Sequence, residues 1–209
     1  MRAPRFARNT PAIVSKPLVE ALLQIMPAPA TSRYSAIAIL LHWLIALLVI
    51  CGFALGLYMV SLKFSPQKLT YYAYHKWIGV SVFLLAVVRI VWRVTHAPPT
   101  QPASMPLWQQ AASGAVHALL YLLLFAAPLS GWLYSSAAGV PTVPFGIEAL
   151  QLPDLVGKDR ALAFDLKFVH MSFTYSLAAL VMLHVTAALK HALIDRDGIM
   201  SRMLPGRSS

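Results

Sequence analysis

The sequence predicts an all-α membrane protein built as a four-transmembrane-helix bundle. Hydrophobic residues make up 58% of the 209 positions and charged residues only 11%, whereas a soluble domain carries about 25% charged residues. Four apolar segments are each long enough to cross about 30 Å of hydrocarbon at about 1.5 Å per helical residue. These observations exclude an ordinary water-soluble globular domain.

The first two helices are expected over residues 36–60 and 74–94. The first lies in a long stretch that contains no charged residue. The second carries Arg89 and Arg93 near its end, where long basic side chains can extend to the lipid headgroups. The segment that follows is broken by prolines, which predicts a loop.

The last two helices are expected over residues 111–135 and 168–190. Pro128 falls inside the third segment, and such prolines are tolerated in membrane helices because neighbouring groups satisfy the freed backbone carbonyl. Residues 137–165 collect Gly, Pro and four acids, which predicts a connection outside the hydrocarbon.

The predicted transmembrane domain covers residues 33–205 and is followed by a short tail, residues 206–209. Residues 1–32 are basic and Pro-rich, and we expect them to form a disordered extension. Met26 is a plausible alternative start.

Basic side chains predict the topology. Four spans place both termini on one side, and eleven of the 17 Lys and Arg residues belong to that side. The positive-inside rule then predicts cytoplasmic termini. The net charge of +10 reflects this topology, so we expect no nucleic-acid partner.

The single cysteine, Cys51, limits the possible redox chemistry. It excludes an intramolecular disulfide, a Cys-ligated zinc site and the covalent attachment of a c-type haem. A redox centre in this chain therefore needs other ligands, and ionisable residues at membrane depth are the first candidates.

Four histidines form a matched set at two depths. His42 lies six residues inside the first span, and His184 lies six residues before the lysine that ends the last span. Both are therefore about 9 Å from the cytoplasmic end. At the opposite end, His75 lies at the start of the second helix and His170 near the start of the fourth. Each depth thus receives one histidine from each of two helices.

Paired imidazoles at two depths fit the axial ligation of two non-covalent b-type haems packed among apolar helices. Two axial histidines leave no open position on the iron, which favours electron transfer over oxygen binding. Zinc and copper fit less well, because each depth offers mainly two protein ligands. Histidines that only pack between helices, and a non-redox transporter or metal-permeation protein, are the alternatives.

Other residues are candidates around these ligands. Gly79, one turn after His75, leaves room for the edge of a macrocycle. Lys76 and Lys167 are placed either to contact haem propionates at the periplasmic end or to act as interfacial anchors. Arg89 is placed either to contact propionates at the cytoplasmic end or to extend to anionic lipid.

Two further histidines have two interpretations each. His117 lies near the level of His42 and His184, so it is either a packing residue beside the haem or a substitute ligand. His191 is either a group that protonates a quinone near the cytoplasmic boundary or a solvated side chain.

An ordered series of short motifs runs from Arg33 to Pro205. The motifs are Arg33-Tyr34, Leu41-His42-Trp43, His75 with Gly79 and Val88-Arg89, His117 followed by Leu120-Tyr121, Pro128 with Gly131, Leu166-Lys167 with His170, Leu183-His184, Ala188-Leu189-Lys190-His191 and Met203-Leu204-Pro205. In these motifs the chain resembles the bacterial cytochrome b561 family. That family belongs to a wider group that includes the cytochrome b subunits of nickel-iron hydrogenases and formate dehydrogenases.

The resemblance implies a dihaem cytochrome of the bacterial inner membrane, in contact with lipid and quinone. It pairs His42 with His184 and His75 with His170, and it makes His117 a non-ligand. Stand-alone members of the family resemble superoxide oxidases, which take electrons from superoxide at the periplasmic side and reduce ubiquinone. The alternative is a membrane-anchor electron-relay subunit of a hydrogenase or dehydrogenase, with a redox partner protein.

Superoxide is a small anion, so clustered bases would steer it towards the protein. Six Lys and Arg residues and four acids are expected on the periplasmic side. Steering therefore requires the bases to gather near the haem, which the linear sequence does not reveal.

Overall fold

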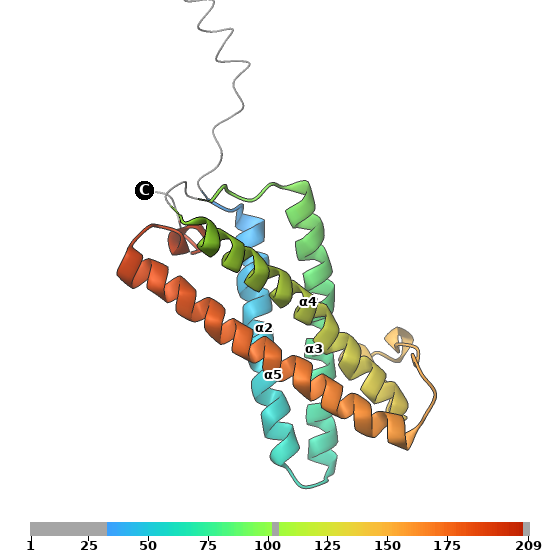
Figure 1. Cartoon of the computed structure of the whole chain (residues 1–209). Helices are drawn as coiled ribbons and strands as arrows, with labels where there is room; N and C mark the ends of the chain where they lie inside the picture. Colours follow the sequence, from blue (N-terminus) through green and yellow to red (C-terminus); the bar gives the residue numbers. More distant parts are fainter. Residues whose placement is uncertain (1–32, 102–104, 207–209) are drawn as a thin grey trace, which may run out of the picture. The chain divides into compact units, whose positions relative to one another are not determined.

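The computed structural model describes residues 33–101 and 105–206. This part of the chain contains four long helices (Figure 1): α2 (Ala36–Ser61), α3 (Pro66–Thr95), α4 (Leu107–Ala137) and α5 (Arg160–Lys190). All four are long and apolar enough to cross a membrane, so the predicted all-α membrane bundle is confirmed. The predicted extension over residues 1–32 and the last residues of the tail lie outside the described residues.

The four helices form two hairpins. α2 packs along α3 and α4 packs along α5, while a smaller contact joins α3 to α4. Figure 1 shows α4 and α5 side by side and inclined to the α2–α3 pair. One cluster of buried side chains joins α2, α3 and α4 through Ile45, Val82, Ala86 and Leu124. A second cluster joins α4 to α5 through Leu123, Ala127 and Leu177.

Much of the apolar surface faces outward. Leu40, Leu47 and Leu84 are each more than half exposed. In water a large surface of this kind promotes association, whereas a hydrocarbon environment removes the cost of exposing it. The helix surfaces are therefore suited to lipid.

Three helices begin earlier than hydropathy alone predicts, α3 and α5 by eight residues and α4 by four. α3 starts with Pro66, and the Ser65 hydroxyl accepts a hydrogen bond from the Lys68 N–H. At the start of α5, the Asp159 carboxylate accepts the N–H groups of Ala161 and Leu162. Proline and side-chain caps favour helix starts regardless of hydropathy, so the helices extend beyond their apolar segments.

One end of the bundle holds residues 33 and 206, and we call it the terminal end. Here the Arg33 guanidinium donates to the carbonyls of Leu204 and Gly206. The Trp43 indole donates to the Met203 carbonyl at 2.8 Å. The two chain ends of the domain are thereby tied together. Two short helical turns lie in this region, η3 (His191–Asp195), a π-turn that continues α5, and η4 (Met200–Arg202).

The opposite end, which we call the loop end, carries the connection over residues 138–159. The Trp132 indole donates to the Pro153 carbonyl, and the Ser136 hydroxyl accepts the Leu155 N–H. These bonds hold the connection against the end of α4. Its regular elements are η1 (Pro144–Gly146), η2 (Glu148–Leu150) and a β-bridge between Thr142 and Leu152.

Candidate functional site

Two histidines meet near the loop end, His75 from α3 and His170 from α5. Their ring centroids are 6.1 Å apart. The Nδ1 atom of His75 lies 3.0 Å from the Gly52 carbonyl of α2, and that of His170 lies 3.0 Å from the Ala127 carbonyl of α4. A carbonyl can only accept, so both Nδ1 atoms donate and both Nε2 atoms keep a free electron pair. That tautomer is the one that binds a metal through Nε2.

Glycines make room for both rings. Gly56 lies one turn after Gly52, and a Cβ at Gly56 would lie 3.2 Å from His75 Cε1. Gly131 lies one turn after Ala127, and a Cβ there would lie 3.0 Å from His170 Cε1. Residues four apart share a helix face. Each hairpin therefore places an accepting carbonyl next to a gap, by which we mean the space left by the missing side chain of Gly56 or Gly131.

Sequence reasoning missed Gly56 as a site residue and noted Gly131 only in a family motif with Pro128, because nothing in the linear pattern relates either glycine to a ring on another helix. It also missed Ser130, whose hydroxyl lies 3.2 Å from His170 Nδ1 and donates to the Ala127 carbonyl. A glycine one turn after a glycine in a membrane helix, as at 52 and 56, is the one signal that could have pointed to a close approach. At Gly79, the glycine that was predicted, an added Cβ meets nothing within 4 Å, so the space beside it is open.

A second pair of histidines, His42 from α2 and His184 from α5, meets nearer the terminal end. Their ring centroids are 6.2 Å apart, almost the same separation as in the first pair. The structure also brings His117 of α4 close, with its ring centroid 5.2 Å from that of His184. Ser113 Oγ lies 3.4 Å from His117 Nδ1.

The side chain of Arg89 lies beside this second pair. Its guanidinium donates to the Ala38 carbonyl, one turn before His42, and to the Tyr121 hydroxyl at 3.1 Å. This side chain therefore ties α3 to α2 and α4. Arg93 lies over the Tyr121 ring, 5.9 Å from its centre, so two positive charges lie on the same helix towards the terminal end.

The two ring separations can be compared with the spacing of two imidazoles that bind the same haem iron. An iron held midway between two imidazoles, with bonds of about 2 Å, requires ring centroids about 6 Å apart. The pairs His75/His170 and His42/His184 both fit this spacing. His117 is closer to His184 than two opposed ligands would be.

The other predicted cofactor contacts lie as follows. Lys76 Nζ donates to the carbonyls of Val140 and Pro141, both at 3.1 Å, so it fastens the loop-end connection to α3. Lys167 lines a cavity at the loop end together with Lys158 and Arg160. A contact of Lys76 or Lys167 with a haem propionate stays a prediction.

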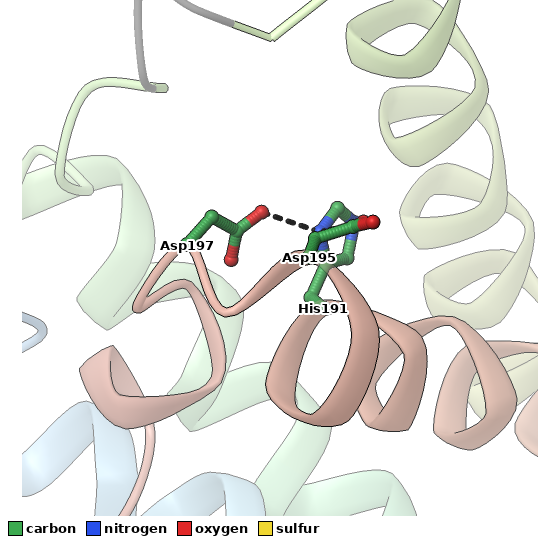
Figure 2. A group of neighbouring side chains, drawn as sticks. All are labelled: His191, Asp195 and Asp197. Atoms are coloured by element: carbon green, nitrogen blue, oxygen red, sulfur yellow. Dashed lines mark hydrogen bonds and ion pairs between the residues drawn. The ribbon is translucent and has the colours of Figure 1, made fainter.

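His191 lies beyond the second pair and is not solvated freely. Figure 2 shows its ring close to the side chains of Asp195 and Asp197, with Nδ1 at 2.6 Å from Asp197 Oδ2 and 3.3 Å from Asp195 Oδ2. Desolvation by itself raises the pKa of Asp197, but hydrogen bonds from the Ile199 N–H and from His191 outweigh it and hold that pKa below its usual value. Asp197 therefore keeps its negative charge beside the His191 ring.

The fold and the site define a class, a membrane-embedded helical bundle with paired interior histidines. Residues 33–206 match the family model of prokaryotic cytochrome b561. The chain belongs to this family, a family of haem-binding membrane cytochromes of electron transport, so the predicted membership is confirmed.

Curated relatives agree with this assignment. Cytochrome b561 homolog 2 of Escherichia coli strain K12 is 37% identical over 184 residues, which cover 85% of this chain and 93% of the relative. The probable superoxide oxidase CybB of Yersinia pestis is 29% identical over 182 residues, covering 83% and 96%. Cytochrome b561 homolog 1 of Escherichia coli strain K12 is 27% identical over 177 residues, covering 84% and 99%.

The gap at Gly131 gives a first prediction. In the variant Gly131→Val, the added side chain displaces the His170 ring, so we expect a lower haem-to-protein ratio than in the wild type. Gly114→Val is the matched control, because Gly114 lies on the same helix and a Cβ there meets nothing within 4 Å. The ratio is measured from haem absorbance and amino-acid analysis of purified protein. Equal ratios in both variants would contradict the role of the gap.

Proposed function

We propose that this chain is a dihaem membrane cytochrome that transfers electrons from superoxide to ubiquinone. The observation that carries the proposal is the convergence of four histidines into two pairs with nearly equal ring separations, 6.1 and 6.2 Å. His170 and His184, one from each pair, are 14 residues apart on α5, which is about 21 Å along the helix. This distance supports two redox sites that together reach across most of a bilayer.

In the proposed arrangement, His75 and His170 hold one haem iron and His42 and His184 hold the other. When bound, the haems supply one-electron carriers. The Nδ1 hydrogen bonds of His75 and His170 fix the ring orientation and make the free nitrogen more basic. The open space beside Gly79 is available to a macrocycle edge.

Basic side chains near each pair are the proposed contacts for propionates. They are Lys76 and Lys167 at the loop end and Arg89 at the terminal end. Lys76 and Arg89 already donate to backbone carbonyls, so each would share its remaining donors with a carboxylate.

The proposed location is the bacterial inner membrane, with both termini in the cytoplasm. The excess of Lys and Arg on the side of the termini supports this orientation. The loop end then faces the periplasm, where the His75/His170 pair is the nearer one to an external electron donor.

The name of the Yersinia relative supports superoxide as the donor. Two superoxide anions each lose one electron and become dioxygen, and one quinone gains two electrons and two protons to become quinol. The protons come from the cytoplasmic side in our proposal. His191 gives a proton to the quinone oxygen and regains it from water, and Asp197 holds the His191 ring in place through its Nδ1 atom.

The function is tested with purified protein. We expect a reduced-minus-oxidised spectrum of two b haems per chain, and ubiquinone reduction that depends on a superoxide source and disappears when superoxide dismutase is added. Two haems without superoxide reactivity would contradict the proposed donor. That result would favour an electron-relay subunit with a protein donor.

The ligand assignment is tested with two histidine variants. His170→Ala removes one proposed ligand, so we expect loss of one of the two haems. His117→Ala removes a ring that lies outside both pairs, so we expect both haems to stay. Haem stoichiometry and low-temperature spectra distinguish the outcomes. If His117→Ala loses a haem and His170→Ala keeps both, the proposed pairing is wrong.

The proposed proton donor is tested by separating two half-reactions. General acid catalysis contributes about 10²-fold or more, so His191→Ala is expected to slow haem reoxidation by ubiquinone by roughly that factor while haem reduction by superoxide keeps its rate. Asp197→Asn should cause a smaller loss. His96→Ala, which changes an exposed loop histidine, is the control. Stopped-flow spectra measure both steps, and unchanged reoxidation in His191→Ala would remove the assigned role.

A further inference from the structure

A cavity of about 500 Å³ opens at the loop end, between the end of α4 and the start of α5. Three basic side chains line it, Lys158, Arg160 and Lys167, together with the ring of Tyr134. Phe164 contributes to its apolar wall. None of the histidine pairs lines this cavity, so it is a separate feature of the bundle.

Hydrogen bonds fix the backbone around this cavity. The Asp159 N–H donates to the Ala137 carbonyl at 2.9 Å, which adds to the two bonds that hold residues 153–155 against α4. At Gly139 a Cβ would lie only 2.8 Å from Lys158 Cδ. The absence of a side chain there lets the stem of Lys158 lie across the end of α4, so the position of this lysine is built into the fold.

No carboxylate of the described residues forms an ion pair with the three basic side chains of the cavity, and the Asp159 carboxylate between Lys158 and Arg160 in the chain is used as the cap of α5. Within the part of the chain that the structure describes, the ion pairs involve only Lys190, His191, Asp195 and Asp197, all at the terminal end. Asp165 lies five residues after Arg160 on α5, about 140° around the helix, and so on another face. Three cations around one cavity attract an anion.

The surroundings of the cavity indicate which anion fits. Along α5 from the cavity towards the membrane centre, Phe164 and Phe168 are 63% and 51% exposed. Their rings contact each other with centroids 4.9 Å apart. A small soluble anion would not contact these two exposed rings. A phospholipid has a charged phosphate for the cavity and acyl chains that can pack against the rings.

We propose that this cavity binds an anionic phospholipid. The phosphate lies between Lys158 and Arg160, which leaves Lys167 to the propionate of the proposed function, and an acyl chain follows Phe164 and Phe168 along α5. The site goes beyond the proposed electron transfer and does not depend on which donor or acceptor the protein uses.

The experiment compares lipid binding to haem-loaded protein by native mass spectrometry, with phosphatidylglycerol and phosphatidylcholine added in detergent. We expect one phosphatidylglycerol to stay bound where phosphatidylcholine does not. In Lys158→Gln/Arg160→Gln we expect affinity for phosphatidylglycerol to fall about tenfold. Lys63→Gln/Lys68→Gln, with the same change of charge on the same side, should bind like the wild type. Lys158→Arg/Arg160→Lys keeps the charge and should retain the lipid.

Three results would overturn the proposal. Equal lipid binding in the two glutamine variants would show that the site is not at this cavity. Displacement of the lipid by millimolar inorganic phosphate would indicate a site for soluble phosphate. Equal retention of phosphatidylcholine and phosphatidylglycerol would show that the site does not select an anionic headgroup. Unchanged haem content in the variants shows that they are folded.

Discussion

The hydrogen bond from an interior histidine to a backbone carbonyl of the neighbouring helix is the constraint on which this bundle depends. His75 and His170 each make one, to Gly52 and Ala127. Such a bond requires the helix to approach the ring closely, because the accepting carbonyl belongs to the backbone. It also sets the tautomer, and so decides which nitrogen of each ring is free for chemistry.

The same arrangement occurs in both hairpins. In α2 and in α4, the accepting carbonyl is followed one turn later by a glycine, Gly56 or Gly131, that leaves space for the ring. The hairpins therefore present their histidines to each other in the same way. Because the gaps and the carbonyls lie on rigid helices, the separation of the two rings is fixed by packing.

The second pair of histidines has different surroundings. His42 and His184 lie beside a third imidazole, His117, and beside Arg89, whose guanidinium bridges three helices. The environment of a haem influences its redox potential through charge and hydrogen bonding. In our proposal each pair holds a haem, and the unequal surroundings of the two pairs would then give the electron transfer a direction.

The sequence by itself determined the four helices and the two depths at which the histidines lie, because apolar length and helical rise are local properties. Only the tertiary structure decided how the helices approach each other. Gly56, Gly131 and Ser130 gain their roles from contacts with rings on other helices, and the direction of Lys76 depends on carbonyls more than 60 residues away.

The early starts of α3 and α5 were also not predicted from hydropathy, because they depend on caps at Ser65 and Asp159. Contacts between distant segments depend on packing, which linear spacing does not encode.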